Sequence, residues 1–221
     1  MDVAEEAPGA PPGEGMVWIP GGTFTMGSDR HYPEERPAGP VTVDGFWMDE
    51  TAVTNRMFAR FVAETGYVTT AEKAPDPAMY PGADPSMLVP GSITFAKPRG
   101  PVDLSDPLQW WAWTPGAQWR HPWGPGSTID EMEDHPVTQV TYADADAYAR
   151  WAGKQLPTEV QWERAGRGGL EGAEFAWGDE LAPGGKEKMN RWIGEFPWKF
   201  RPRPGGARKP GTVPVRTFGP N

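Results

Sequence analysis

Cysteine is absent from all 221 residues of the chain. Disulfide bonds, thiolate metal sites and cysteine nucleophiles are therefore excluded within this sequence. Histidine is almost as scarce, because the chain has only His31, His121 and His135, and no two of them are four residues apart. A helical metal site of the His-Glu-x-x-His kind needs that spacing. We therefore expect no catalytic metal centre built on histidine.

Positive charge and long apolar runs are also deficient. Lys and Arg number 21 against 30 Asp and Glu, so the formal net charge is −9 and nucleic-acid phosphates would be repelled. The apolar runs are far shorter than the roughly 18 residues that span a bilayer. The acidic start of the chain has no apolar core of the kind found in a signal peptide. We expect no nucleic-acid partner, no membrane segment and a cytoplasmic location.

Glycine, proline and tryptophan, by contrast, are abundant, with 28, 27 and 12 copies. A Gly and Pro content this high approaches that of low-complexity chains, but large rings in such number oppose disorder. A chain of 221 residues is most simply one large domain. Residues 1–15, rich in Pro, Gly and Glu, are expected to be a disordered lead-in. Residues 16–221 are expected to fold around aromatic rings.

Short strands are predicted near the start of the chain. Residues 17–19 and 23–26 flank Pro20-Gly21-Gly22, a pattern that predicts a hairpin, and the β-branched and aromatic content of 41–48 predicts a third strand. Residues 66–141 show no sustained period. Their tryptophans (Trp110, Trp111, Trp113, Trp119 and Trp123) favour a loop that is packed internally.

Three helices are predicted by their caps. Each begins after a threonine in the N-cap position and stops near a glycine. They cover residues 55–65 after Thr54, 142–152 after Thr141, and 159 to about 166–169 after Thr158. In the third, Gln161 completes a capping box with Thr158, and Trp162 is expected to pack.

The polar residues alone predict no catalytic constellation. The acid pairs Asp144/Asp146 and Glu159/Glu163 are most simply helix caps and solvated or paired side chains. The glycine-rich stretch 166–169 follows a helix, whereas a phosphate-binding loop must precede one. The sequence also lacks a Gly-x-Ser-x-Gly nucleophile elbow.

An ordered set of short strings nevertheless carries a family resemblance. The strings are IPGGTFTMG at 19–27, DETAVTN at 49–55, GAQWRHP at 116–122, WAGKQLPTEVQWE at 151–163, FAWGDE at 175–180, GEFP at 194–197 and GTVPV at 211–215. Across residues 16–221 and in this order, the chain resembles the formylglycine-generating enzyme family, also called sulfatase-modifying factors.

The resemblance implies a C-type-lectin-like α+β fold, rich in loops and poor in regular structure. It implies an oxidase that uses O₂ and copper to convert a cysteine to formylglycine in a Cys-x-Pro-x-Arg segment of an unfolded sulfatase polypeptide, which would be the partner. Other branches of the family are binding modules. The alternative is therefore a non-catalytic, lectin-like module that binds a peptide or another ligand.

The chain departs from the family in the residues that hold copper. Active members bind Cu(I) through two cysteines near the C-terminus, and this sequence has none. It stops at Asn221, where relatives continue toward the cysteine-bearing segment. We expect residues 16–221 to be the N-terminal portion of the domain, truncated before that segment and incomplete at the C-terminus. No catalytic residue is expected within it, and alone it should be inactive.

Two pairs of residues match family sites. Trp110 and Trp111 match a tryptophan pair near the substrate groove; the alternative, favoured for aromatic rings in general, is that they are core rings of an irregular loop. Asn190 matches a residue whose side-chain oxygen binds a structural Ca²⁺, and Arg191 the residue that adds its backbone carbonyl. The acid that completes that site in relatives is missing from residues 201–209. Asn190 could instead cap a turn.

Overall fold

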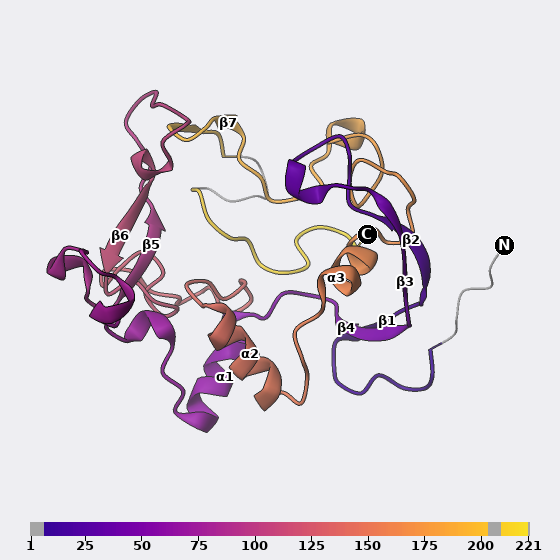
Figure 1. The fold of residues 1–221 in the computed structure, drawn as a ribbon, viewed down its shortest axis with the longest axis horizontal. Coiled ribbons are helices and arrows are strands. Elements are labelled where there is room, and N and C mark those ends of the chain that lie inside the picture. Colours follow the sequence, from indigo (N-terminus) through magenta and orange to yellow (C-terminus); the bar gives the residue numbers. More distant parts are fainter. Residues whose placement is uncertain (1–6, 203–208, 221) are drawn as a thin grey trace. The chain divides into compact units, whose positions relative to one another are not determined.

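The computed structural model describes residues 7–202 and 209–220 (Figure 1). These residues form two compact units. The first contains Met1–Thr51, Leu156–Met189 and Phe218–Asn221, and the second contains Ala52–Gln155 and Asn190–Thr217. Of the predicted disordered lead-in, residues 1–6 lie outside the described part, and residues 7–15 form turns and bends that are mostly exposed. The expectation of one family domain over residues 16–221 stays a prediction.

The first unit is built on a long antiparallel ribbon. Strand β1 (Met16–Ile19) pairs with β4 (Phe46–Asp49), and β2 (Gly22–Met26) pairs with β3 (Gly39–Val43). The register continues across the gap, because Ile19 faces Phe46 and Gly22 faces Val43. A cross-strand pair of rings, Trp18 and Trp47 with centroids 5.5 Å apart, packs on one end.

The predicted hairpin between residues 17–19 and 23–26 is therefore wrong, although both strands exist. Pro20-Gly21 interrupts one arm of the ribbon, and Asp44-Gly45 interrupts the other directly opposite. The interruption also divides the single strand predicted at 41–48 into β3 and β4. The register is the same on both sides of the interruption, and the loop that connects the two arms lies at residues 27–38.

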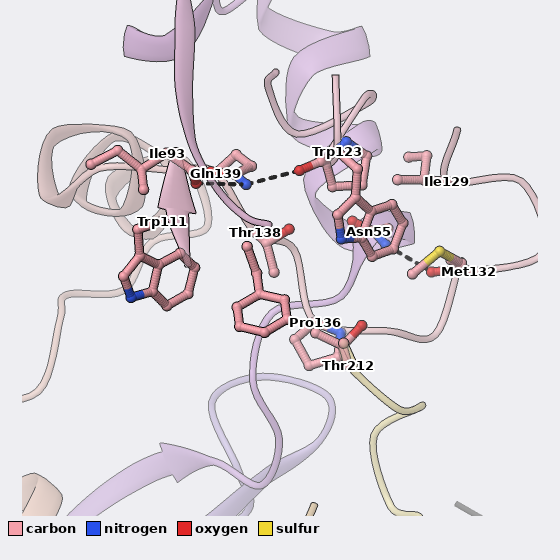
Figure 2. Close-up of a pocket in the computed structure, with 13 residues that line it drawn as sticks. Asn55, Ile93, Trp111, Trp123, Ile129, Met132, Pro136, Thr138, Gln139 and Thr212 are labelled. Atoms are coloured by element: carbon pink, nitrogen blue, oxygen red, sulfur yellow. Dashed lines mark hydrogen bonds between the residues drawn. The ribbon is translucent and has the colours of Figure 1, made fainter. Parts of the chain in front are cut away.

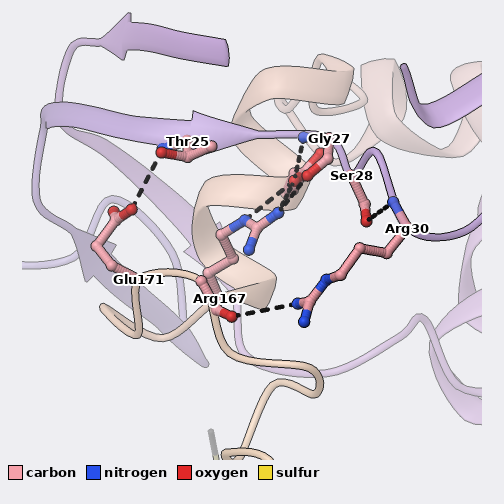
Figure 3. Close-up of polar contacts among 8 residues, drawn as sticks. Thr25, Gly27, Ser28, Arg30, Arg167 and Glu171 are labelled. Carbon is pink, nitrogen blue, oxygen red and sulfur yellow. Dashed lines mark hydrogen bonds and ion pairs between the residues drawn. The ribbon is translucent and has the colours of Figure 1, made fainter. Parts of the chain in front are cut away.

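Helix α3 (Glu159–Gly166) is joined to this ribbon by its charged side chains (Figure 3). The guanidinium of Arg164 donates to the carbonyls of Pro20 and Gly21 at 3.2–3.3 Å. The Glu163 carboxylate accepts from the Gly27 amide at 2.8 Å and pairs with Arg167. The capping box of Thr158 and Gln161 is confirmed. Trp162, which is expected to pack, is instead 64% exposed, because the face of α3 that meets the ribbon carries the charged Glu163 and Arg164.

The second unit has its core between α1 (Asn55–Thr65) and α2 (Tyr142–Trp151). The predicted caps are confirmed: Thr54 Oγ1 accepts from the Met57 amide, Thr141 forms a capping box, and Gly66 takes the left-handed conformation. Helix α2 ends one residue earlier than expected. The buried core residues are Phe58, Phe61, Val62 and Trp119.

The tryptophan-rich segment of the second unit is packed, as expected, but it also contains a sheet that sequence reasoning missed. Strand β5 (Gly91–Phe95) pairs antiparallel with β6 (Trp111–Pro115). A smaller pair joins β7 (Gly194–Glu195) to β8 (Lys199–Phe200). Short 3₁₀ turns complete the structure: η1 Pro33–Glu35, η2 Thr70–Glu72, η3 Pro77–Met79, η4 Pro85–Met87, η5 Pro107–Gln109 and η6 Pro183–Gly185.

The fold is thus a small mixed α/β arrangement with short sheets and many loops, as expected. The lectin-like topology and the incomplete C-terminus stay predictions. Within residues 7–202 and 209–220, no helix is long and apolar enough to cross a membrane.

Candidate functional site

The second unit contains a pocket of about 170 Å³ (Figure 2). Its lining residues share one property: none carries a formal charge. They are Asn55, Ile93, Phe95, Trp111, Pro122, Trp123, Ile129, Met132, Pro136, Thr138, Gln139, Gly211 and Thr212. An aromatic and aliphatic lining with a few amide and hydroxyl groups is typical of sites that bind uncharged organic groups.

Two aromatic walls bound the pocket. Trp111 begins β6 and faces Phe95 of β5 across the sheet, with ring centroids 5.7 Å apart. Trp123 lies on the other side, with Pro136 and Thr138 between the two tryptophans in Figure 2. The Lys209 ammonium lies 4.6 Å from the centroid of the Trp123 ring. That distance is typical of a cation–π contact, so the Lys209 ammonium lies over the face of this ring.

The helical side of the pocket is fixed by Asn55, the first residue of α1. Its side chain donates to the Met132 carbonyl at 2.8 Å, and its backbone amide donates to the His135 carbonyl at 2.9 Å. Asn55 is only 3% exposed. The loop that supplies Met132 is thereby tied to the start of a helix that contributes Phe58, Phe61 and Val62 to the core.

His135 does not line the pocket but contacts a residue that does. The Nδ1 atom of His135 lies 2.8 Å from the hydroxyl oxygen of Thr212, a lining residue. Burial lowers the pKa of His135, although the charge of Asp134 and the Thr212 hydrogen bond act in the opposite direction. The imidazole is therefore neutral near neutral pH, and the surroundings of Thr212 gain no charge from it.

Similarity to known proteins gives this site a context. The chain matches the sulfatase-modifying factor enzyme 1-like domain over residues 2–221. It belongs to this family. The formylglycine-generating enzyme of Mycobacterium tuberculosis is 52% identical over 206 residues, which cover 93% of this chain and 68% of that protein. An inactive Cα-formylglycine-generating enzyme 2 from Mus musculus is 39% identical over 209 residues, covering 93% of this chain and 62% of that protein.

These relatives are longer than the chain, which spans about two thirds of their length. The structure of PvdO from Pseudomonas aeruginosa is a remote neighbour, with a TM-score of 0.49 and 17% identity over 93% of this chain and 63% of that one.

The tryptophan pair expected from the family resemblance divides between two environments. Trp110 is 7% exposed and packs edge-on against Phe196, so it is a core ring. Trp111 is 42% exposed and lines the pocket. The structure therefore places one member of the pair where a ligand could touch it. Substrate binding by Trp110 and Trp111 stays a prediction.

The two residues expected at the family's calcium site make other contacts. The amide nitrogen of Asn190 donates to the Gly211 carbonyl at 2.8 Å, and the Arg191 guanidinium donates to the carbonyl of Trp192. Among the described residues, no group of three or more acids or histidines could hold a metal ion. Residues 203–208 of the acid-free stretch lie outside the described part. Calcium binding at Asn190 and Arg191 stays a prediction.

Sequence reasoning missed most of the pocket. Asn55 lies in a family string and Trp123 lies in a tryptophan-rich stretch, but neither pattern indicates that the residue lines a pocket. Gln139 gave no signal, because its partners are 17 to 47 residues away in the sequence. Locally, the sequence shows only that two polar residues, Thr138 and Gln139, lie between Val137 and Val140.

Proposed function

We propose that the protein to which this chain belongs is a formylglycine-generating enzyme. It would use O₂ and copper to convert a cysteine of a sulfatase Cys-x-Pro-x-Arg segment to formylglycine. Membership of the family and 52% identity to an enzyme of that name support the proposal. The lectin-like fold and a cytoplasmic location belong to the same proposal.

The observation that carries the proposal is the uncharged aromatic pocket that contains Trp111. Such a lining favours apolar groups, since burial of apolar surface contributes about 25 cal/mol per Å². It disfavours charged groups, because none of its own residues could compensate their desolvation. We propose that the pocket receives an uncharged part of the substrate polypeptide and that the charged arginine of the segment lies outside it.

The residues of this chain do not fit a thiolate copper centre. Cu(I) selects soft sulfur ligands, and the 221 residues contain no cysteine. A centre of that kind needs thiolates from residues outside this sequence. The part assigned to this chain is binding and orienting the polypeptide, without a redox step.

A second candidate is a binding module that recognises a peptide without oxidising it. Similarity to a mouse relative that is named as inactive favours it. The pocket would serve either function. The two candidates differ in whether the gene encodes two closely spaced cysteines past the codon for Asn221, which sequencing would show.

Peptide binding tests the assignment of the pocket. A fluorescent Cys-x-Pro-x-Arg peptide should bind the chain saturably in an anisotropy titration. Trp111→Ala should weaken that binding at least about tenfold, as expected for a truncated aromatic anchor. Trp162→Ala is the matched control, because that ring is exposed and belongs to the first unit. Equal affinity of the Trp111→Ala and wild-type proteins would remove the pocket from the substrate site.

A further inference from the structure

Gln139 occupies an unusual place in the pocket wall. Its backbone φ is +60°, a left-handed conformation that residues other than glycine rarely adopt. Val137 and Val140 on either side pack against the aromatic core, whereas Thr138 and Gln139 both line the pocket. Side chains of an extended segment alternate between two faces. The left-handed residue interrupts this alternation and places two successive side chains in one wall.

The side-chain amide of Gln139 joins both aromatic walls (Figure 2). Its oxygen accepts from the Ser92 hydroxyl at 2.5 Å, and its nitrogen donates to the Ile93 carbonyl at 3.4 Å. The same nitrogen donates to the Pro122 carbonyl at 2.9 Å. Ser92 and Ile93 belong to β5, which pairs with the strand that carries Trp111, and Pro122 directly precedes Trp123.

These contacts use the whole hydrogen-bonding capacity of the amide NH₂ group. It has two N–H donors, and each faces a backbone carbonyl. No N–H is left to recognise a ligand. Gln139 is thus suited to hold the walls rather than to bind what lies between them, and an unfavourable backbone conformation is retained where the surrounding contacts require it.

We infer that Gln139 is a positioning residue that sets the separation of Trp111 and Trp123, and thereby the affinity of the pocket for the substrate polypeptide. The inference about affinity rests on the function proposed above. The inference about geometry does not, because it follows from the three hydrogen bonds and the left-handed backbone of Gln139.

Two variants separate this role from a general effect on folding. Gln139→Glu keeps the shape but places a carboxylate oxygen against the Ile93 and Pro122 carbonyls, so both donated bonds are lost. Gln139→Asn tolerates the left-handed backbone better but is one methylene too short to span the walls. Gln161→Glu is the matched control. The amide oxygen of Gln161 accepts hydrogen bonds from Thr158, and a carboxylate oxygen at this position would accept them too.

The measurements are peptide affinity and the ¹⁵N–¹H indole signals of the tryptophans. Both Gln139 variants should shift the signals of Trp111 and Trp123 and weaken peptide binding about tenfold. The signal of Trp151, which packs against the core cluster of the same unit, should stay in place. The Gln161 variant should change none of these. Unchanged Trp111 and Trp123 signals would overturn the inference. So would a common shift of all indole signals with a fall in melting temperature in both variants, since that result indicates a folding role only.

The two proposals can fail separately. If the wild-type chain does not bind the peptide, the proposed function is wrong, and the indole signals alone decide whether Gln139 positions the walls. If the peptide binds and both variants bind it as tightly as the wild type, the function stands and the role of Gln139 in affinity is wrong.

Discussion

The Tyr67 hydroxyl donates to the carboxylate of Asp144 at 3.0 Å. Asp144 is the third residue of α2 and is fully buried, and its carboxylate accepts five hydrogen bonds in all, from Tyr67, from Thr70 and from its own N-cap residue Thr141. A residue that the sequence presents as a surface cap acid therefore joins the start of α2 to the segment after α1. It fixes one end of the second unit's core.

Asp144→Asn should destabilise the chain by about 2–4 kcal/mol, because the asparagine amide would turn a donor toward groups that are themselves donors. Asp146→Asn is the control, since Asp146 pairs with the exposed Arg150 and should cost less than about 0.5 kcal/mol. Urea denaturation followed by circular dichroism measures both. Equal midpoints for the two variants would contradict the structural role of Asp144.

The same carboxylate makes stability depend on acid. Burial raises the pKa of Asp144, but the hydrogen bonds from Thr141, Thr70 and Tyr67 outweigh it, and the net pKa is lowered. A lowered pKa means that the stabilisation is present above the unfolded value of about 3.9 and is lost as the pH falls through the folded value. The stability difference between wild type and Asp144→Asn should therefore shrink below about pH 4. A constant difference down to about pH 2 would contradict this.

A third prediction concerns Glu163 in the first unit. Its carboxylate bonds the Gly27 amide and the Arg167 guanidinium, both of them part-buried, so Glu163→Gln should cost about 1–2 kcal/mol. Glu64→Gln removes an i,i+4 pair with the exposed Arg60 and should cost no more than about 0.5 kcal/mol. Thermal denaturation at low and high salt would compare them. A loss for Glu163→Gln that disappears in high salt would indicate only a surface pair.

The sequence predicted the parts of the fold that depend on neighbours along the chain. Thr54, Thr141 and Thr158 each bond an amide three residues away, so their helices could be located from a few letters. The pairing of the ribbon could not be predicted in this way, since Ile19 and Phe46 are 27 residues apart in the sequence. The sequence predicts the strands of the ribbon but not which strands pair with each other.

The pocket was hidden for the same reason. Trp111 could be proposed from the family's tryptophan pair. That Trp110 lies in the core and Trp111 in the pocket could not be predicted, because Trp110 packs against Phe196, which is 86 residues further along the chain. Gln139 bonds residues of β5 and of the loop before Trp123, and neither contact leaves a periodic pattern. Long-range hydrogen bonds of this kind cannot be predicted from the sequence.

Calcium gives a fourth prediction. Asn190 uses its amide nitrogen on the Gly211 carbonyl, and the described residues offer no cluster of acids nearby. Millimolar Ca²⁺ should therefore raise the melting temperature by less than about 2 °C, because a ligand stabilises only in proportion to its binding. Asn190→Ala should lower the melting temperature equally with and without Ca²⁺. A large rise with Ca²⁺ that Asn190→Ala abolishes would show that Asn190 binds the ion.

The last prediction concerns catalysis by these 221 residues alone. With added copper and O₂, they should not convert the cysteine of a Cys-x-Pro-x-Arg peptide to formylglycine, because no thiolate is present to hold Cu(I). Mass spectrometry of the peptide, against a control with copper and no protein, measures the conversion. The peptide should still bind, and Trp111→Ala should weaken that binding, so loss of chemistry can be told from loss of folding. Conversion above the control would mean that ligands other than cysteine support the oxidation, and the division of labour proposed for this chain would be wrong.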